Sequence, residues 1–268
     1  MLMAVNVGNT LISVGFFDDA SSEVINKFEL STDPLKTVDE YFATVKVLVR
    51  ECDFDTSGLC GGVVSSVVPQ LTVTICDTVK RFTGSDPVLV SPGVKTGFPI
   101  KIDSPAELGG DMVANAAAVV SKMKSQDNMR AAAVIDMSAV TTVSAINKNG
   151  EYLGCAIFSG VEMSLDALHV KTALLPSVAY SSQTRAIGRN SQEAVLSGVM
   201  LGHAMTVNGF IARFAKEMKT PVESISCVIT GEYAKYVIPH LRYEFEYDES
   251  LTLKGLYFIY QKSKENKT

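Results

Sequence analysis

The side chains that could do chemistry in this sequence are acids, amides and hydroxyls. The candidates are Asn6, Thr10, Asp111, Asp136, Thr141, Thr142 and Thr172. Such a set suits phosphoryl transfer, in which the protein mainly positions phosphates and metal while one carboxylate orients or deprotonates an attacking hydroxyl. The sequence contains no GxxxxGK[ST], GxGxxG, HExxH or GxSxG motif. His169, His203 and His240 are too dispersed to predict a metal site.

Two strand–turn–strand patterns, about half a chain apart, hold several of these candidates. In residues 2–17 an apolar run ends at Asn6, Gly8 provides a turn, and apolar alternation then resumes. The same plan recurs in residues 131–146, where Asp136 takes the place of Asn6. A polar turn between buried strands presents N–H groups and hydroxyls to an anion. Each copy alone predicts an ordinary hairpin, but the pair favours a duplicated fold with a ligand between the copies.

Asp111 lies in a segment with a helix-start signal. Ser104-Pro105-Ala106-Glu107 reads as a capping box with proline at the first helical position, and it predicts a helix that runs to about Met123. Gly109-Gly110-Asp111 would then fall in the second turn. Two glycines cost a helix about 1 kcal/mol each relative to alanine. Either a ligand or backbone comes close there and Asp111 faces it, or the glycines serve helix–helix contact and Asp111 is solvated.

The elements that must position these residues alternate between strands and helices, which predicts an α/β architecture. Further strands are predicted at 24–30, 59–66, 87–90, 152–158 and 225–230. Helices are predicted at 37–52, 70–82, 161–174 and 190–219, with a helical or mixed segment at 251–260. The polar stretch 125–130 is the predicted boundary between two domains, 1–124 and 125–268.

Composition narrows the class of protein. Of the 268 residues 47% are hydrophobic and 20% charged, as in a soluble globular protein. A net charge of -5 argues against a nucleic-acid partner, which would need a basic surface. The 5 cysteines form no CxxC pair, so we expect reduced thiols and a cytoplasmic location. We expect no signal peptide and no membrane-spanning segment.

Seven stretches of the sequence resemble motifs of one family, the type III pantothenate kinases of the actin/hexokinase/Hsp70-like ATPase superfamily. Asn6-Val7-Gly8-Asn9-Thr10 resembles its D-x-G-N-T loop, and residues 136–142 resemble D-x-G-T-A-T-T. Residues 105–115 resemble P-x-E-x-G-A-D-R-x-x-N. The others are 31–41, 65–69 (S-S-V-V-P), 164–176 (S-x-x-A-L-x-x-R-T-A-x-L-P) and 251–260 (L-T-L-x-G-L-x-x-I-Y).

This resemblance implies two duplicated ribonuclease H-like (actin-like ATPase) domains with the ligand site in the cleft between them. It implies ATP-dependent phosphorylation of pantothenate, the first step of coenzyme A biosynthesis, by a cytoplasmic homodimer. Implied cofactors are ATP, Mg²⁺ and a monovalent cation, K⁺ or NH₄⁺.

The resemblance also assigns roles to individual residues. Asp111 would be the base that activates the pantothenate hydroxyl. Gly109, Gly110, Asp111 and Met112 would line the substrate, which Thr172 would reach from the second subunit. Asp136 would belong to the monovalent-cation site. ATP and its phosphates would be bound by Asn6, Gly8, Asn9, Thr10, Ala139 and Thr142.

The sequence departs from the family at positions that contact ligands. Asn6 replaces the aspartate of the first loop, and Ser138-Ala139 replace Gly-Thr in the second. Met112 replaces an arginine, Ser159-Gly160 a Pro-Gly pair and Gly231-Glu232 a Gly-Gly pair. Three hypotheses remain open: a working pantothenate kinase, a catalytically impaired paralogue that acts as a ligand-binding or regulatory protein, and a kinase of altered substrate, since Met112 suits a less anionic alcohol.

Overall fold

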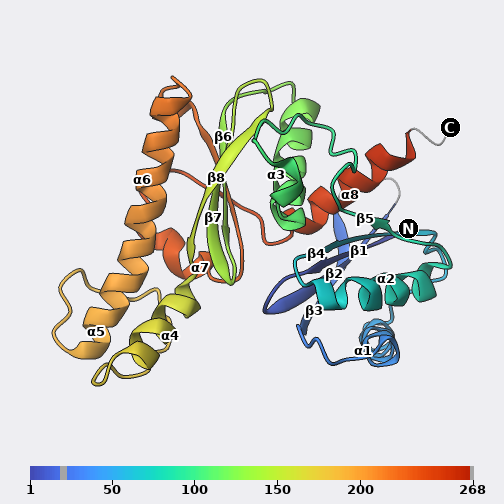
Figure 1. The fold of residues 1–268 in the computed structure, drawn as a ribbon, viewed down its shortest axis with the longest axis horizontal. Coiled ribbons are helices and arrows are strands. Elements are labelled where there is room, and N and C mark those ends of the chain that lie inside the picture. Colours follow the sequence, from blue (N-terminus) through green and yellow to red (C-terminus); the bar gives the residue numbers. More distant parts are fainter. Residues whose placement is uncertain (19–22, 266–268) are drawn as a thin grey trace. The chain divides into compact units, whose positions relative to one another are not determined.

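The computed structural model describes residues 1–18 and 23–265, which form two compact units. Unit 1 comprises Met1–Gln126 together with the segment from Ser250 onward, and unit 2 comprises Asp127–Glu249 (Figure 1). Each unit holds one five-stranded mixed sheet with its own helices. The α/β architecture predicted from the sequence is therefore confirmed.

The sheet of unit 1 has the order β3-β2-β1-β4-β5. β1 (Leu2–Val7) pairs antiparallel with β2 (Leu11–Phe17), which pairs antiparallel with β3 (Val24–Ser31). On its other side β1 runs parallel to β4 (Gly61–Ser66), and β4 runs parallel to β5 (Val88–Leu89). The predicted opening hairpin is thus confirmed, and the carboxyl ends of β1 and β4 meet at one edge of the sheet.

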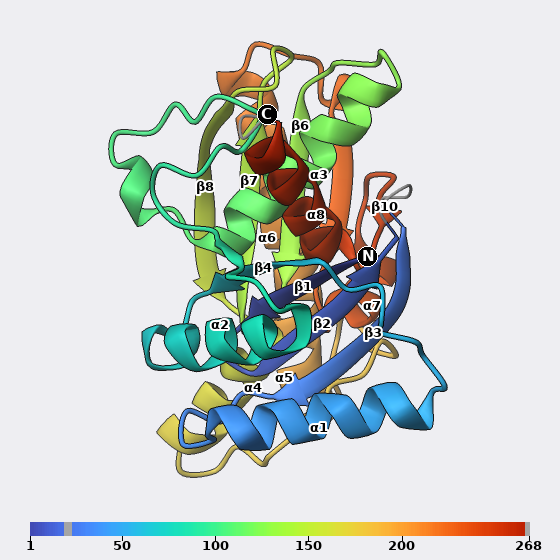
Figure 2. The ribbon, with the colours of Figure 1, turned by 90° about the vertical axis from the view of Figure 1, so that its right-hand side faces the viewer.

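Helices cover both faces of this sheet (Figure 2). α1 (Val38–Glu51), which begins with a capping box at Thr37, and α2 (Pro69–Thr83) pack with Met3, Val5 and Val7 in one apolar cluster. α3 (Gly110–Ser125) and α8 (Leu251–Lys264) pack together on the opposite face. Because side chains alternate along a strand, Asn6 faces the side of α3 and α8.

The C-terminal helix differs from the predicted domain division, which placed all of 125–268 in the second domain. α8 belongs to unit 1 because it packs closely along α3. A side-chain carbon on Gly255 would lie 1.8 Å from the carbonyl oxygen of Ala114, so only glycine allows this approach. Thr252 also donates a hydrogen bond of 2.7 Å to Asn115. The transition after Gln126 falls within the predicted boundary at 125–130.

The predicted start of the Asp111 helix is wrong. Pro105–Glu107 forms only a short 3-10 turn, and Ser104 makes no side-chain capping bond. Leu108 is extended, with ψ 123°, so the chain leaves the helical conformation before Gly109 caps α3. Asp111 consequently lies in the first turn of α3 rather than the second, near the positive end of the helix dipole.

The sheet of unit 2 repeats the strand order of unit 1. Its order is β10-β9-β6-β7-β8, in which β6 (Ala132–Met137), β7 (Val140–Ile146) and β8 (Tyr152–Ser159) are antiparallel. β9 (Ser226–Thr230) runs parallel to β6, and β10 (Glu246–Tyr247) runs parallel to β9. The two sheets therefore have the same connectivity and directions, which is the duplication that the two hairpin patterns predicted.

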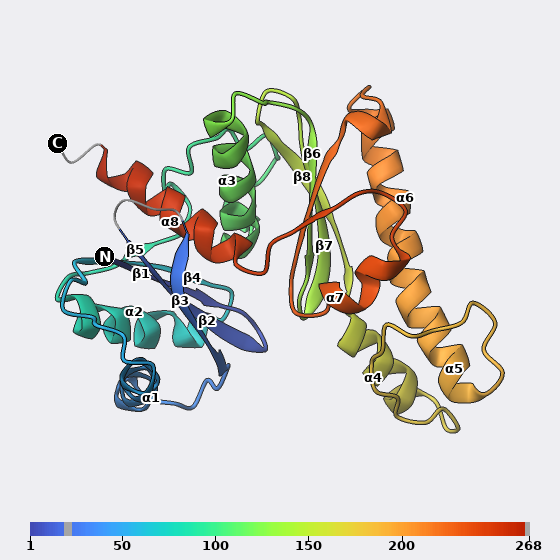
Figure 3. The same cartoon turned by 180° about the vertical axis from the view of Figure 1, so that it is seen from behind.

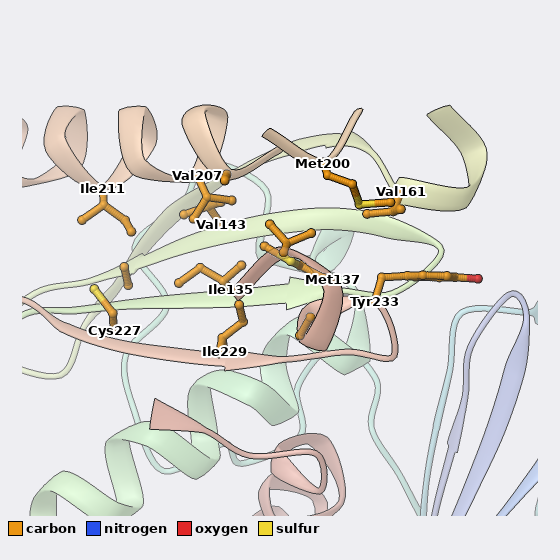
Figure 4. Packing of buried hydrophobic residues seen from close by; sticks show 14 of the residues in the cluster. Ile135, Met137, Val143, Val161, Met200, Val207, Ile211, Cys227, Ile229 and Tyr233 are labelled. Atoms are coloured by element: carbon orange, nitrogen blue, oxygen red, sulfur yellow. The ribbon is translucent and has the colours of Figure 1, made fainter. Parts of the chain in front are cut away.

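The helices of unit 2 complete its core. These are α4 (Val161–Lys171), α5 (Ser191–Leu196), a π turn at Ser197–Leu201, α6 (Gly202–Glu217) and α7 (Ala234–Val237), with short 3-10 turns at Val222–Ser224 and Ile238–His240 (Figure 3). Val207 and Ile211 of α6 pack on Ile135 and Val143 of the sheet (Figure 4). Among the described residues, Ser191–Glu217 is the one helical run long and apolar enough to cross a membrane, but these buried contacts are those of a core helix.

Candidate active site

The turn between β1 and β2 is held by hydrogen bonds from its own backbone and from the chain after β3. The N–H of Gly8 donates to the carbonyl of Leu11 at 2.9 Å, and the hydroxyl of Thr32 donates to the carbonyl of Gly8 at 2.7 Å. The N–H of Thr32 also donates to the carbonyl of Thr10 at 2.9 Å. Asn9 and Thr10 remain exposed on this fixed loop. The loop therefore offers an amide and a hydroxyl to a ligand.

Two polar atoms just behind this loop are buried without a partner in the part of the chain that the structure describes. They are Oδ1 of Asn6 and Oγ of Ser65. The two residues are neighbours in the parallel ladder of β1 and β4, so their side chains share the face toward α3. Leaving a buried polar group unpaired costs about 1–3 kcal/mol. Oδ1 of Asn6 can accept a hydrogen bond from a ligand, and the Ser65 hydroxyl can accept or donate one.

Asp111 occupies the N-terminal turn of α3 beside these groups. Its Oδ1 accepts a hydrogen bond of 2.7 Å from the N–H of Met112. Burial raises the pKa of the Asp111 carboxyl above its ordinary value, more than the backbone hydrogen bonds lower it. A side-chain carbon on Gly110 would lie 2.6 Å from Oγ of Ser65, so glycine lets the helix approach the strand. A partly buried carboxylate with a raised pKa is a good proton acceptor.

A pocket of about 490 Å³ opens next to the start of α3. Gly109 and Gly110 line it at the helix end, and Ser66 lines it at the end of β4. The remaining wall comes from α2, the loop after β5 and the 3-10 turn before α3. A small organic acceptor of a few hundred Å³ fits such a space. The Asp111 carboxylate lies next to the lining residue Gly109, since a carbon on Gly109 would be 2.6 Å from Oδ1 of Asp111.

The turn between β6 and β7 in unit 2 carries a carboxylate that already has a partner. The hydroxyl of Ser138 donates a hydrogen bond of 2.5 Å to Oδ1 of Asp136. Thr142 is the ladder neighbour of Asp136 on β7 and is also buried. The hydroxyl of Thr141 is buried without a partner among the described residues. This turn therefore combines one negative charge with hydroxyl oxygens.

Two glycines pack directly on the backbone of this second turn. A side-chain carbon on Gly160 would lie 2.3 Å from the carbonyl oxygen of Ala139. A carbon on Gly231, whose φ is 99°, would lie 2.4 Å from the backbone of Met137. The N–H of Tyr233 donates to the carbonyl of Met137 at 3.0 Å. Three segments thus converge on the turn and fix its shape.

A contact that the sequence did not predict joins two of these segments. The hydroxyl of Tyr233 donates a hydrogen bond of 2.6 Å to Oε2 of Glu162 at the start of α4. Burial and this bond raise the pKa of the Tyr233 hydroxyl, so Tyr233 stays protonated as the donor. The partners are 71 positions apart, and neither belongs to a local motif that would have indicated the pair.

The structure places the predicted site residues in two groups, one in each unit. In unit 1 it brings together Asn6, the turn after it and Gly109–Met112 through Ser65. In unit 2 it groups Asp136, Ala139 and Thr142. Thr172, at the C-terminal cap of α4, is exposed, and its hydroxyl donates to the carbonyl of Leu168 at 2.8 Å. Within one copy of the chain, the Thr172 hydroxyl caps the C-terminal end of α4.

Two sheets of identical strand order, each with a polar turn after its first strand, define the duplicated α/β fold of the actin/hexokinase-like class. The chain belongs to the type III pantothenate kinase family, whose model matches residues 2–213. A type III pantothenate kinase of Citrifermentans bemidjiense is 34% identical over 98% of this chain and 100% of its own length. The type III pantothenate kinase of Moorella thermoacetica is 35% identical over 98% of this chain and 100% of its own length.

Solved structures of low sequence identity share the fold. A conserved Baf family protein from Campylobacter jejuni superposes with a TM-score of 0.60 at 15% identity, covering 98% of this chain and 99% of its own. Component A of the (R)-2-hydroxyglutaryl-CoA dehydratase from Acidaminococcus fermentans gives 0.52 at 12% identity, covering 98% of each chain. These similarities confirm the duplicated fold.

Proposed function

We propose that Asp111 is the catalytic base of a pantothenate kinase reaction in this chain. The observation that carries the proposal is a partly buried carboxylate of raised pKa in the first turn of α3, next to Gly109, which lines a pocket of about 490 Å³. Asp111 takes the proton of the acceptor hydroxyl while that oxygen forms a bond to the γ-phosphorus of ATP. The bond between this phosphorus and the β–γ bridging oxygen breaks, and ADP leaves.

The phosphate groups of ATP are assigned to the two turns. Gly8, Asn9 and Thr10 bind from unit 1, where Thr32 fixes the loop, and Ala139 and Thr142 bind from unit 2. The unpartnered oxygens of Asn6 and Thr141 support this assignment, because a buried acceptor or hydroxyl needs a ligand or water to satisfy it.

The same oxygens suit hard cations. Mg²⁺ prefers oxygen ligands and would neutralise charge on the transferred phosphoryl group. Oδ1 of Asn6 would hold it directly or through water, and the Asp136 carboxylate would contribute to a site for K⁺ or NH₄⁺. These are neutral and anionic oxygen donors of the type that both ions require.

A homodimer is the assembly that we propose, with Thr172 of a second copy reaching the acceptor. Large apolar side chains stand exposed near Thr172 and on α6, namely Val170 at 71%, Leu174 at 92% and Met205 at 69%. Exposed apolar side chains favour a protein partner where they lie together in one patch, as we propose for these three. Met205→Glu should raise the dimer dissociation constant at least tenfold in sedimentation analysis, whereas Glu217→Gln, as a surface control, should not.

The experiment that tests this function is a product assay. Purified protein is incubated with ATP, Mg²⁺, K⁺ and pantothenate in buffer at neutral pH, and phosphopantothenate is measured by mass spectrometry. We expect product that requires both ATP and protein. A folded protein that forms no product would contradict the kinase and favour a paralogue that only binds ligands.

A further inference from the structure

We propose that Tyr233 and Glu162 are positioning residues that hold the turn between β6 and β7 in the shape that binds the phosphates of ATP. This inference rests on the proposed function, which assigns that turn to ATP. It is carried by a side chain that joins two segments of unit 2, both of which pack on the backbone of the turn.

The first of these segments follows β9 and contacts the turn through its backbone. The N–H of Tyr233 donates a hydrogen bond of 3.0 Å to the carbonyl of Met137, the last residue of β6. Two positions earlier, a side-chain carbon on Gly231 would lie 2.4 Å from the backbone of Met137. Figure 4 shows Tyr233 and Met137 at the same end of the sheet. The segment 231–233 is therefore fastened to the start of the turn.

The second segment is the start of α4, which packs on the next two residues of the turn. A side-chain carbon on Gly160, the N-cap of α4, would lie 2.7 Å from the carbonyl oxygen of Ser138 and 2.3 Å from that of Ala139. The N–H and the hydroxyl of Ser164 both donate to the carbonyl of Gly160, at 2.9 and 2.8 Å. Glu162 lies in the same first turn of the helix. A displacement of Glu162 therefore also displaces Gly160 against the turn.

The Tyr233 hydroxyl connects the two segments. It donates a hydrogen bond of 2.6 Å to Oε2 of Glu162. A hydrogen bond from a hydroxyl to a carboxylate is roughly twice as strong as one between neutral groups. The Tyr233 ring is buried and packs edge-on against the ring of Tyr180, with centroids 5.4 Å apart, so the direction of the hydroxyl is fixed. The bond therefore sets the separation of the two segments that pack on the turn.

The part of the turn that these contacts hold is the part that we assign to ATP. Gly160 packs on the carbonyl of Ala139, and Thr142 is the ladder neighbour of Asp136 at the base of the same turn. A site that is held in its binding shape before the ligand arrives binds more tightly, because less ordering is needed on binding. Loss of the bond between Tyr233 and Glu162 should therefore weaken ATP binding, although neither residue is assigned to contact ATP.

The test compares Tyr233→Phe with a matched control, Tyr152→Phe, in the full chain. Both changes remove a buried tyrosine hydroxyl and keep the ring. Tyr152 contacts the Ser144 hydroxyl at 3.1 Å and pairs with Ile146, at the end of the β7–β8 pair away from the turn. In calorimetry the Kd for Mg²⁺–ATP should rise about fivefold or more in Tyr233→Phe, the lower range for coupled sites, and less than about twofold in Tyr152→Phe. The KM for ATP should follow the Kd, while the KM for pantothenate stays nearly constant.

Two variants of Glu162 test whether the pair acts through its hydrogen bond. Glu162→Gln keeps an oxygen that can accept from Tyr233, so it should leave the Kd for Mg²⁺–ATP nearly constant. Glu162→Ala removes that acceptor and should raise the Kd as much as Tyr233→Phe does. The two changes combined should raise it no further, because residues that act through one contact are not additive. Additive effects would overturn the proposed pair.

The outcomes separate this inference from the proposed function. An equal Kd for Mg²⁺–ATP in Tyr233→Phe and Tyr152→Phe would overturn the inference, while phosphopantothenate formed by the unaltered protein would leave the kinase assignment standing. An unaltered protein that binds Mg²⁺–ATP but forms no product would contradict the kinase, and the two Kd values would still decide the inference. An unaltered protein that does not bind Mg²⁺–ATP would contradict both. If Tyr233→Phe does not fold, Glu162→Ala, at an exposed position, gives the deciding Kd.

Discussion

The turn between β1 and β2 and the turn between β6 and β7 occupy the same place in two sheets of the same order, but they hold their polar groups differently. In unit 2 the Asp136 carboxylate is bonded to Ser138, two glycines pack against the turn backbone, and only the Thr141 hydroxyl of this turn lacks a partner in the described chain. In unit 1 Asn6 is neutral, and its Oδ1 and the hydroxyl of Ser65 have no partner in the described chain.

This difference shows that two sheets of the same strand order need not give their corresponding turns the same function. The second turn is shaped by its own unit, because Gly160 and Gly231 fit against its backbone without a ligand. The first turn leaves buried polar groups whose cost only a ligand or water removes. Unit 1 instead carries a partly buried acid, Asp111, in the first turn of α3, and we propose that this acid accepts the proton.

The largest effect is expected where the second turn is packed most tightly. Gly160→Ala adds a carbon 2.3 Å from the Ala139 carbonyl oxygen, so the backbone must move. We expect a loss of about 2 kcal/mol in the free energy of unfolding, or roughly 4–8 °C in thermal midpoint, with weaker ATP binding. Ser159→Ala, at the exposed neighbouring position, is the control; it loses a hydrogen bond of 2.8 Å to the Ser164 hydroxyl and should change stability by less than about 1 kcal/mol. Equal stability of the two variants would show that the turn is not fixed by this packing.

A smaller effect, on kcat, is expected when the turn between β1 and β2 is given a carboxylate like that of the turn between β6 and β7. Asn6→Asp with Ala139→Thr introduces a carboxylate and a hydroxyl into the two turns that we propose bind phosphate. Because one transition-state contact is worth about 3 kcal/mol, even partial recovery should raise kcat about tenfold. Steady-state kinetics at saturating ATP and Mg²⁺ measure it, with Asn6→Ala as the control that removes the oxygen. No gain from the double variant would indicate that Asn6 already serves its purpose.

The smallest expected effect is a difference in the free energy of unfolding between two serine substitutions. One removes a hydroxyl that has no partner in the described chain, and the other removes a hydroxyl that is hydrogen-bonded. Ser65→Ala removes a buried hydroxyl without a partner, so the free energy of unfolding should stay within about 0.5 kcal/mol while the Kd for Mg²⁺–ATP rises. Ser144→Ala, on β7, removes a contact of 3.1 Å with the Tyr152 hydroxyl and should cost about 1 kcal/mol. Chemical denaturation and calorimetry measure both. Equal destabilisation by the two substitutions would contradict the comparison.

Local sequence pattern was enough to predict most elements of both units. Both hairpins, the helix α1 and the buried strands follow from apolar alternation and helical spacing, which act within a few positions. The start of α3 was mispredicted because Ser104-Pro105 initiates only one 3-10 turn. The extended backbone of Leu108, which separates this turn from α3, has no local sequence signal. The placement of α8 in unit 1 depends on Gly255 meeting Ala114, a contact far apart in sequence.

Part of the candidate site could also be predicted from local sequence pattern. Asp111 and the turn residues were found because they lie in short polar stretches between apolar runs. Burial of Ser65 without a partner, and the bond from Tyr233 to Glu162, depend on distant segments and have no local signal.

The measurement that tests the central claim most directly is the pH dependence of kcat/KM for the unaltered protein and for Asp111→Asn. Asparagine keeps an oxygen that can accept the Met112 N–H but cannot take a proton from the acceptor. Because burial raises the pKa of Asp111, activity of the unaltered protein should fall as pH falls, with a midpoint above 3.8, the ordinary value of an aspartate. Asp111→Asn should lose at least about a hundredfold in kcat, the lower range for a general base, and should lose this acid limb. Retention of more than a tenth of the activity, with the acid limb intact, would contradict the account.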